Sequence, residues 1–473
     1  MLKNKEFRQF AHEVADWMAN YLQNVDQYPV KSQVQPGDIL QQIPEYPPEN
    51  EEPMNNIFND FKRIIIPGIS HWQSPNWFAY FQANSSYPSI LAEMITATLG
   101  AQCMVWETSP AAAELEERMM QWLKNLTGLP ENFEGVIQDT ASTSTLCAIL
   151  TAREKASEFG INKSGFPATR YRVYCSLEAH SSIDKAVRIS GLGHDNLVRI
   201  KTHINDLSMD PDALEKSLMK DIENGLKPLC VIATIGTTGT MAIDPLEPIG
   251  EICQKYKIWL HVDAAYAGTA MFLPEYRWMI KGIELADSYV FNPHKWMFTN
   301  FDCSAYYVKD KESLIRTFSI MPEYLKTAFD EKVNNYRDWG IQLGRRFRAL
   351  KLWFVLRSYG AEGIRKVIGN HVFWAQNLAA EIGKQPDFEI MAPCLLNMIC
   401  FRYHPEGVDD AESLNRLNEK LIRNLNISGR MYVSHTKIKS NFVIRFAAGQ
   451  TFLQERHLLD AWLFIKEEAR KLE

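Results

Sequence analysis

The sequence predicts an α/β fold built on a mostly parallel central sheet with helices on both faces. From residue 171 to residue 263, short apolar runs alternate with segments of helical periodicity. Strands buried in a parallel sheet are apolar throughout, and repeated strand-helix units form right-handed crossovers. Polar residues directly follow several of the apolar runs, as is typical of the sheet edge where α/β proteins bind their ligands.

The chain has 473 residues, more than one hydrophobic core usually holds, and we expect three parts. Residues 1–85 begin with an amphipathic helix and continue as a Pro-rich extended arm, which we expect to pack on a partner subunit. Residues 86–360 form the large α/β domain. Residues 361–473 mix helices with strand-like runs at 398–402 and 442–446, as is typical of a smaller α+β domain.

Composition narrows the class of protein. The net charge of −6 gives no support to nucleic-acid binding, which requires a basic surface. The chain has no run of 18 apolar residues that could span a membrane, and its first residues lack the apolar core of a signal peptide, so we expect a cytoplasmic protein. The eight cysteines show no spacing typical of a metal site, and we expect no metal.

Two helices flank a strand in the next part of the chain. Ser109 and Pro110 suit the N-cap and the first position of a helix, which Gly128 ends. The strand-like residues 135–138 lead into 139–145, where small hydroxyl residues open the second helix. The free N–H groups and positive dipole at such a helix start can bind a phosphate, although ordinary capping explains the same residues.

Strand and helix patterns alternate from residue 171 onwards. A strand at 172–176 leads to His180, and another at 229–234 leads into the turn 236–240. A lone histidine is more often a structural residue, but one placed beyond a strand end could also stack on a flat cofactor ring. The helix at 248–256 then returns the chain to the next strand.

Asp263 ends the apolar run 258–262 and is followed by small residues. A buried parallel strand delivers a carboxylate to the ligand edge of a sheet in this way, and a buried carboxylate needs a cationic partner. The protonated ring nitrogen of pyridoxal phosphate is such a partner. Taken alone, a helix N-cap or a structural ion pair explains Asp263 equally well.

Lys295 follows the next strand-like run within Asn292-Pro293-His294-Lys295-Trp296. Because Pro293 has no N–H and a fixed φ, we expect the lysine in a strand-to-turn connection and not inside a regular helix. Apolar neighbours would favour its neutral amine, which attacks aldehydes to form Schiff bases. A lysine beside a proline is by itself usually a surface charge. Here, however, Asp263 and Lys295 end successive strands.

Two further segments lack a strict period. Residues 71–81 hold many aromatic side chains, which either staple the loop or form the wall of a pocket for a flat ligand. Residues 320–335 are polar and form either a surface connection or a lid that brings Tyr324 to the substrate as a proton donor.

Three motifs in family order carry a resemblance: Asn292-Pro293-His294-Lys295-Trp296, His261-Val262-Asp263-Ala264-Ala265-Tyr266 and Ala179-His180-Ser181-Ser182. With them the sequence closely resembles the group II pyridoxal-phosphate-dependent decarboxylases, and among these the aromatic L-amino-acid decarboxylases. The resemblance extends from the first helix to about residue 450. It implies the aspartate-aminotransferase type of fold (fold type I), pyridoxal 5'-phosphate as cofactor, and a homodimer with its sites at the interface.

The resemblance also implies a role for each matching residue. Lys295 would carry the cofactor, Asp263 would pair with the pyridine nitrogen, and His180 would stack on the ring. The other residues implied to bind the cofactor are Ala141, Ser142, Thr238, Ala265, Asn292 and His294. Ala141, Ser142 and Asn292 match the phosphate cradle. Tyr324 matches the mobile-loop tyrosine of the decarboxylases.

The implied reaction is the decarboxylation of an aromatic L-amino acid to its arylalkylamine and carbon dioxide. Tryptophan, 5-hydroxytryptophan, DOPA, tyrosine and phenylalanine are the candidate substrates. Tyr324 and His180 favour this reaction over the oxidative route of the aldehyde synthases, which resemble this chain but tend to have Phe or Asn there. A non-catalytic paralogue would be expected to have lost Lys295, Asp263 or Tyr324, and all three are present.

The residues implied to contact the substrate are Trp72, Tyr80, Phe81, Gln102, Met104 and Gly344. Gly344 matches the aromatic decarboxylases, whereas histidine decarboxylases tend to have Ser. The positions that depart from the animal pattern are Gln82, Gln102, Met104 and Gln342. These departures leave the preferred aromatic substrate open, and an apolar pocket rejects an added hydroxyl poorly, so we expect a broad substrate range.

Overall fold

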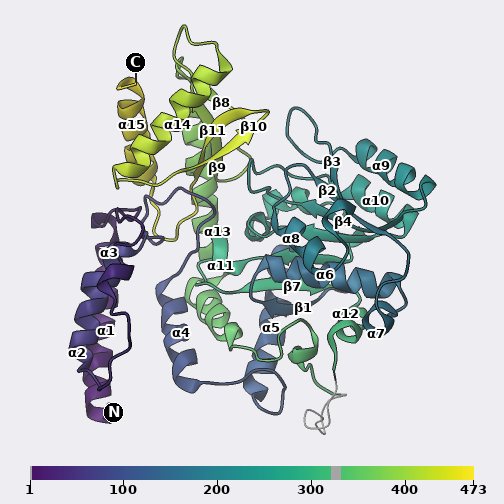
Figure 1. Ribbon diagram of the computed structural model, residues 1–473, viewed down its shortest axis with the longest axis horizontal. Coiled ribbons are helices and arrows are strands. Elements are labelled where there is room, and N and C mark those ends of the chain that lie inside the picture. The colour runs from purple at the N-terminus through teal and green to yellow at the C-terminus, as the bar shows by residue number, and fades with distance from the viewer. Residues whose placement is uncertain (1–2, 321–331, 473) are drawn as a thin grey trace. The chain divides into compact units, whose positions relative to one another are not determined.

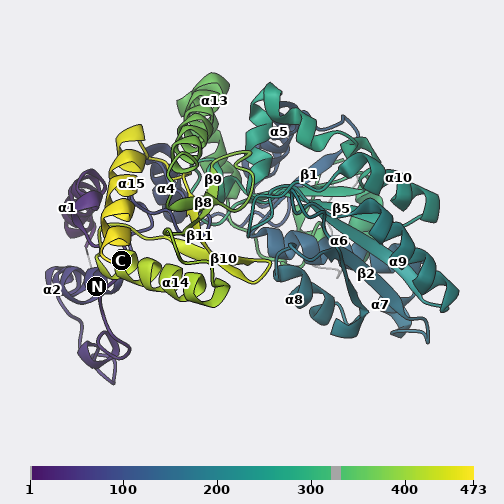
Figure 2. The ribbon, with the colours of Figure 1, turned by 90° about the horizontal axis from the view of Figure 1, so that it is seen from above.

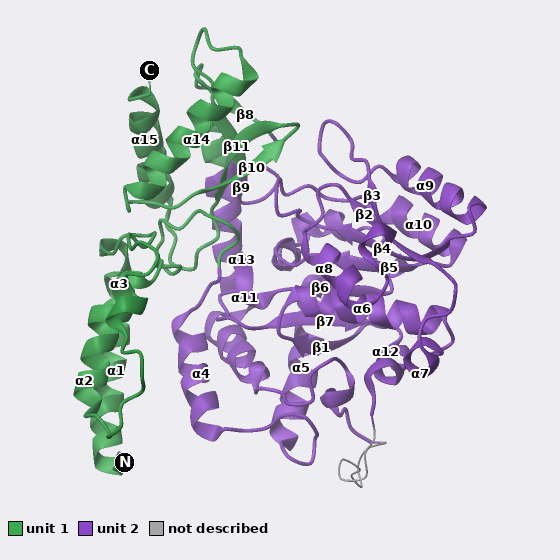
Figure 3. Cartoon of the chain, in the orientation of Figure 1, with its two compact units in different colours: residues 1–82, 377–391, 400–473 green, residues 83–376, 392–399 purple. Residues whose placement is uncertain are grey.

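The computed structural model describes residues 3–320 and 332–472 (Figure 1). Contacts within the chain divide it into two compact units (Figure 3). Unit 1 comprises residues 1–82, 377–391 and 400–473, and unit 2 comprises residues 83–376 and 392–399. The boundaries predicted after residues 85 and 360 stay predictions. Among the described residues, no helix is both long and apolar enough to cross a membrane.

Unit 2 is built on a seven-stranded sheet with the strand order β1-β7-β6-β5-β4-β2-β3. Its strands are β1 (Glu134–Gln138), β2 (Tyr171–Ser176), β3 (Leu197–Ile200), β4 (Lys227–Thr234), β5 (Trp259–Asp263), β6 (Ser288–Phe291) and β7 (Ser304–Val308). Neighbours from β3 to β6 pair in parallel, whereas β7 pairs antiparallel with both β6 and β1. Six of the seven strands therefore run in one direction, which confirms the mostly parallel sheet predicted from the apolar runs.

Helices cover both faces of this sheet (Figure 2). The helices of unit 2 are α4 (Tyr87–Leu99), α5 (Pro110–Thr127), α6 (Ala141–Ala156), α7 (Ile161–Ser164), α8 (Ser182–Ile189), α9 (Pro211–Glu223), α10 (Leu246–Tyr256), α11 (Pro293–Trp296), α12 (Lys311–Phe318) and α13 (Arg348–Ile382), which continues into unit 1. Right-handed crossovers put α6 and α8 on one face, and α9 and α10 on the other, because the two pairs connect strands in opposite directions along the sheet. Apolar side chains of α6 and α8 form a buried core with β2, β4 and β6.

Local sequence explains where these helices begin and end. Pro110 occupies the first turn of α5, and Gly128 ends it in the left-handed conformation, as predicted. Asp210 caps α9 by accepting hydrogen bonds from two N–H groups of its first turn. Gly360, at φ 65° and ψ 164°, breaks α13 into two helical parts, which confirms the break expected there.

Unit 1 combines the N-terminal arm with a four-stranded sheet of order β10-β11-β9-β8. Its elements are α1 (Asn4–Gln23), α2 (Met54–Asp60), α3 (Ile66–Gly68), β8 (Phe388–Ile390), β9 (Met398–Tyr403), α14 (Ala411–Ile427), β10 (Ser434–Ile438), β11 (Asn441–Ala447) and α15 (Glu455–Arg470). The N-terminal helix and the strands expected at 398–402 and 442–446 are confirmed. Helix α1 buries no residue within the chain, although its sequence is amphipathic.

Candidate active site

The candidate site lies at the carboxyl edge of β4, β5 and β6 in unit 2. The register pairs Thr234 of β4 with Asp263 of β5, and Asp263 with Val290 of β6. Shortly after the ends of β4, β5 and β6 come Thr238, Ala265 and Lys295, respectively. All three side chains are half-buried. The prediction that Asp263 and Lys295 follow successive strands is therefore confirmed, and these two strands are also neighbours in the sheet.

Asp263 is buried, with 5% of its surface exposed. Its Oδ1 accepts a hydrogen bond of 3.0 Å from the N–H of Ala265. Its second oxygen receives no hydrogen bond from any described residue, so one side of a buried carboxylate stays available to a cation. The turn after β5 packs closely on β6. A Cβ on Gly268 would lie 2.4 Å from Cβ of Phe291, so this position requires glycine.

Lys295 lies in α11, a single helical turn that directly follows β6. Pro293 occupies the first turn of α11, where its missing N–H costs nothing. The expected strand-to-turn connection is therefore present, but it takes the form of one helical turn and not of an irregular loop. The Lys295 side chain is half-buried, between the buried side chains of His294 and Trp296 in the sequence.

His180 follows β2 at the same edge of the sheet. Its Nδ1 accepts a hydrogen bond of 3.1 Å from the N–H of Ser182 and lies 2.9 Å from Oγ of Ser182. Surrounding protein atoms, and then the charge of Lys295, lower the pKa of His180, while Asp263 acts in the opposite sense. The neutral ring therefore carries its proton on Nε2, and both Lys295 and Asp263 lie within electrostatic reach of it.

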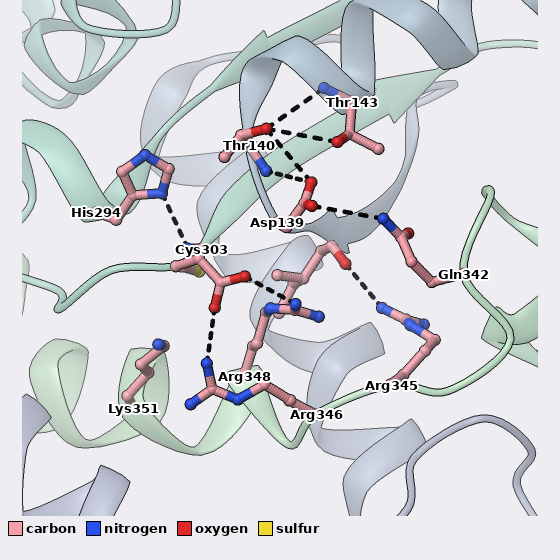
Figure 4. Close-up of polar contacts among 12 residues, drawn as sticks. Asp139, Thr140, Thr143, His294, Cys303, Gln342, Arg345, Arg346, Arg348 and Lys351 are labelled. Atoms are coloured by element: carbon pink, nitrogen blue, oxygen red, sulfur yellow. Dashed lines mark hydrogen bonds and ion pairs between the residues drawn. The ribbon is translucent and has the colours of Figure 1, made fainter. Parts of the chain in front are cut away.

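The N-terminus of α6 offers hydrogen-bond donors to an anion. Thr140 caps this helix through its Oγ1, which accepts the N–H of Thr143 at 3.4 Å (Figure 4). The N–H groups of Ala141 and Ser142 make no hydrogen bond within the described parts of the chain. Both capping and anion binding, the two alternatives from the sequence, are therefore compatible with this helix start.

His294 and Asn292 add buried polar groups beside α11. Nδ1 of His294 accepts the N–H of Cys303 at 2.9 Å (Figure 4). Burial, and then the charge of Lys295, lowers the pKa of His294 to about 3, so the ring is neutral and Nε2 carries its proton. Asn292 is 2% exposed, and its buried Oδ1 has no hydrogen-bond partner among the described residues.

These groups fit pyridoxal phosphate by their chemistry. The amine of Lys295 suits an aldehyde, and the open carboxylate oxygen of Asp263 suits a protonated pyridine nitrogen. The unpaired N–H groups at the start of α6 suit a phosphate. A buried oxygen without a hydrogen bond costs free energy, and Oδ1 of Asn292 is such an oxygen among the described residues. It therefore also indicates that this edge of the sheet contacts a polar group.

The residues expected to contact the substrate divide between the two units. In unit 1, the ring of Trp72 stacks on Trp77 at 4.1 Å and on Tyr80 at 6.1 Å, and Phe81 lies under the guanidinium of Arg445 at 4.5 Å. Trp77 is buried, whereas Trp72 and Tyr80 are exposed. The same aromatic cluster therefore both stabilises the loop and presents an aromatic surface.

In unit 2, Gln102 and Gly344 lie side by side. Oε1 of Gln102 accepts the N–H of Arg345 at 2.7 Å, and a Cβ on Gly344 would lie 3.2 Å from Nε2 of Gln102. Met104 is half-buried, and its carbonyl accepts the N–H of Arg337. Tyr324 lies outside the described residues.

Ion pairs and hydrogen bonds hold the segments on both sides of Gly344 in place (Figure 4). Arg345 is buried and donates to Oε1 of Glu116 at 2.6 Å and to the carbonyl of Ile137 at 2.8 Å. Asp302 accepts from Arg346 at 2.9 Å and from Arg348 at 2.8 Å. Gln342 donates to Asp139, beside the start of α6, at 3.4 Å.

The sequence does not predict the residues that hold the site residues in position. Ser182, although part of a quoted motif, is not identified by that motif as the partner of His180. Asn84 donates a hydrogen bond to the carbonyl of Lys295 from 211 positions away. A serine two residues after a candidate histidine is a local signal, whereas no local pattern predicts the contact of Asn84.

Comparison with known proteins identifies similar chains. A family model described as "Pyridoxal-dependent decarboxylase conserved domain" matches residues 36–404. The chain is 41% identical to tyrosine decarboxylase 4 of Petroselinum crispum, over 100% of this chain and 94% of that protein. It is 39% identical to phenylacetaldehyde synthase of Arabidopsis thaliana, over 100% of this chain and 97% of that protein. The crystal structure of Catharanthus roseus tryptophan decarboxylase in complex with L-tryptophan has a TM-score of 0.94 at 37% identity, covering 100% of this chain and 99% of that one.

Proposed function

The chain belongs to the pyridoxal-dependent decarboxylase family, and we propose that it decarboxylates an aromatic L-amino acid to the corresponding arylalkylamine. It is a carbon-carbon lyase of fold type I, and its cofactor is pyridoxal 5'-phosphate. The observation that carries the proposal is the meeting of Asp263, Lys295 and His180 at one sheet edge of unit 2. The similarity to a tyrosine decarboxylase and to a tryptophan decarboxylase supports an aromatic substrate.

The cofactor, when bound, supplies an aldehyde for the amino group and a ring that accepts the electrons of the broken Cα–carboxylate bond. Lys295 would hold this aldehyde between turnovers and free it for the substrate. The open oxygen of Asp263 would keep a proton on the ring nitrogen through a charge-assisted hydrogen bond. His180, neutral and with its proton on Nε2, would lie against the ring without adding a positive charge.

The phosphate of the cofactor would lie at the start of α6. The N–H groups of Ala141 and Ser142 point out of the first turn of a 16-residue helix, whose positive dipole end favours an anion. Nε2–H of His294 and the amide of Asn292 supply further polar groups from the turn after β6. Thr238 and Ala265, from the turns after β4 and β5, would flank the ring.

We propose six residues for substrate selection, three in each unit. Trp72, Tyr80 and Phe81 present an aromatic surface in unit 1, which suits a flat substrate ring. Within unit 2, Gly344, Gln102 and Met104 are the residues that we propose for contact with the substrate. Tyr324 would donate the proton that replaces the carboxylate at Cα, and this role favours the amine over the aldehyde as product.

We also propose a cytoplasmic homodimer. No residue of the amphipathic helix α1 is fully buried within its own chain. Trp17 packs on Phe58 and Phe61, but Phe7 and Val14 stay exposed, and we propose that this apolar part contacts a second copy. Sedimentation at decreasing protein concentration tests this assembly. A stable and fully active monomer would contradict it.

The test of the function is a product assay on the purified, cofactor-loaded protein. Each candidate aromatic amino acid is supplied, and carbon dioxide, amine, aldehyde and peroxide are measured together. We expect equal amounts of carbon dioxide and amine. The alternative product is the aldehyde with peroxide, which the similarity to a phenylacetaldehyde synthase makes a specific second candidate. Absence of carbon dioxide with every aromatic substrate would refute both.

A further inference from the structure

The lysine turn, Asn292–Phe298, contains more backbone carbonyls than its own hydrogen bonds satisfy. The carbonyls of Asn292 and Pro293 accept the N–H groups of Lys295 and Met297. The carbonyl of Lys295, in the last turn of this short helix, and the carbonyl of Phe298, which follows the helix, need partners from elsewhere. A buried carbonyl left without a partner costs free energy, so the source of these partners matters.

Asn84 and Ser86 supply the two missing donors. Nδ2 of Asn84 donates to the carbonyl of Lys295 at 2.6 Å, and Oγ of Ser86 donates to the carbonyl of Phe298 at 2.7 Å. Asn84 is 1% exposed and Ser86 is fully buried. The two residues precede α4 and are 211 and 212 positions from their acceptors, so both contacts are tertiary.

The end of the lysine turn needs such support. Phe298 has φ 54°, in the left-handed region that disfavours residues with a Cβ. Its ring stacks on Tyr359 at a centroid distance of 5.3 Å. Directly after Lys295, the indole N–H of Trp296 donates to Nδ1 of His371 at 3.1 Å. The main chain around Lys295 is therefore held from several sides, while the lysine side chain is only half-buried.

We propose that Asn84 and Ser86 are positioning residues for Lys295. They fix the main chain of the lysine turn, so that only the side chain moves when Lys295 leaves and rejoins the cofactor aldehyde. They act through two backbone carbonyls and contribute no group to the bond-breaking step. The inference rests on the proposed function, in which Lys295 carries the cofactor.

The variants Asn84→Ala and Ser86→Ala each remove one donor, while Ser86→Thr keeps the hydroxyl. Asn162→Ala is a matched control, because Nδ2 of Asn162 also donates to a distant carbonyl of unit 2, that of Thr317 at 2.9 Å. The first measurement is hydrogen exchange of the amides of residues 295–299 in the cofactor-free chain. The second is the rate at which the loaded protein loses its cofactor absorbance.

We expect Asn84→Ala and Ser86→Ala to increase both rates about ten-fold, the size of effect that one lost buried hydrogen bond produces. Asn162→Ala and Ser86→Thr should leave both rates near those of the native protein. If Asn84→Ala does not fold, the comparison of Ser86→Ala with Ser86→Thr decides. Rates in the alanine variants equal to those of Asn162→Ala would overturn the inference.

Borohydride reduction of the native, loaded protein, followed by peptide mapping, separates this inference from the proposed function. A cofactor tag on Lys295 supports the proposed function independently of the exchange data. A tag on Lys295 with unchanged exchange overturns the positioning role alone. A tag elsewhere, or none, overturns the function of Lys295 and the positioning role with it.

Discussion

Replacement of Asp263 by asparagine tests the electrostatic centre of the site. The Asp263→Asn variant keeps the shape of the side chain, and the amide oxygen can still accept the N–H of Ala265, which lies 3.0 Å from Oδ1 in the native protein. The change therefore removes the charge while it preserves the end of β5. In place of a carboxylate oxygen, the cofactor ring nitrogen then meets an amide, which no longer stabilises a proton on that nitrogen.

The expected size of the effect follows from the lost contact. A hydrogen bond between charged partners contributes about 1.5–3 kcal/mol, and about 1.36 kcal/mol corresponds to ten-fold in rate. Turnover should fall by about 10- to 150-fold from this contact alone. Because the ring also becomes a weaker acceptor of electrons, this range is a lower bound. Asp263→Ala, which removes both oxygens, should lose most of the activity.

The assay measures carbon dioxide release at saturating cofactor, together with the absorbance of the lysine-bound cofactor. We expect the absorbance to persist while turnover falls, because Lys295 is unchanged. Asp221→Asn is the control: Asp221 is also largely buried in unit 2, where it accepts the hydroxyl of Tyr174 at 2.7 Å. That variant should lose stability and keep its turnover. Near-native turnover in Asp263→Asn would refute the role of Asp263.

Three further predictions concern acid stability, substrate size and product type. Burial lowers the pKa of three histidines, to about 4 for His261, about 3 for His294 and about 3 for His371. Unfolded histidines bind a proton below about pH 6.5, so the free energy of unfolding should fall as the pH drops from about 6.5 to about 4, by up to about 4 kcal/mol per pH unit. Urea unfolding at several pH values measures this slope, which His371→Phe should reduce by about a third; an unchanged slope would contradict the assignment. Gly344→Ala puts a Cβ 3.2 Å from Nε2 of Gln102 and should lower kcat/KM for tryptophan about ten-fold more than for phenylalanine, whereas equal losses would exclude Gly344 from the pocket wall. Tyr324→Phe should increase the share of aldehyde and peroxide among the products, and an unchanged ratio would remove Tyr324 from the proton-donor role.

The sheet and the chemistry at its edge were predictable because they depend on short-range patterns. A buried strand such as β5 must be apolar along its length, so the charge at Asp263 is conspicuous at its end. Parallel strands end at one edge, so the next strand in sequence brings Lys295 to the same place. The direction of β7 was not predictable, since its five buried residues fit a parallel or an antiparallel neighbour equally well.

The contacts that hold the site residues were not predictable, because they join distant parts of the chain. Asn84 reads as an ordinary polar residue after an aromatic loop, and only the fold brings it to the carbonyl of Lys295. Arg345, next to the expected substrate residue Gly344, would be placed on the surface by its charge. It is buried instead, because Glu116 and the carbonyl of Ile137 both accept its hydrogen bonds.

The protonation state of His180 connects these local contacts to the proposed chemistry. In the proposed function, a protonated imidazole stacked on the cofactor would repel the protonated pyridine ring that Asp263 would stabilise. Surrounding protein atoms and the charge of Lys295 both lower the pKa of His180 and favour the neutral imidazole, and so does the N–H of Ser182, which donates to Nδ1. The charges of Asp263 and Asp184 act in the opposite sense and raise the pKa of His180. In the proposed function, a neutral His180 would let the negative charge of Asp263 act on the ring nitrogen without competition from the imidazole.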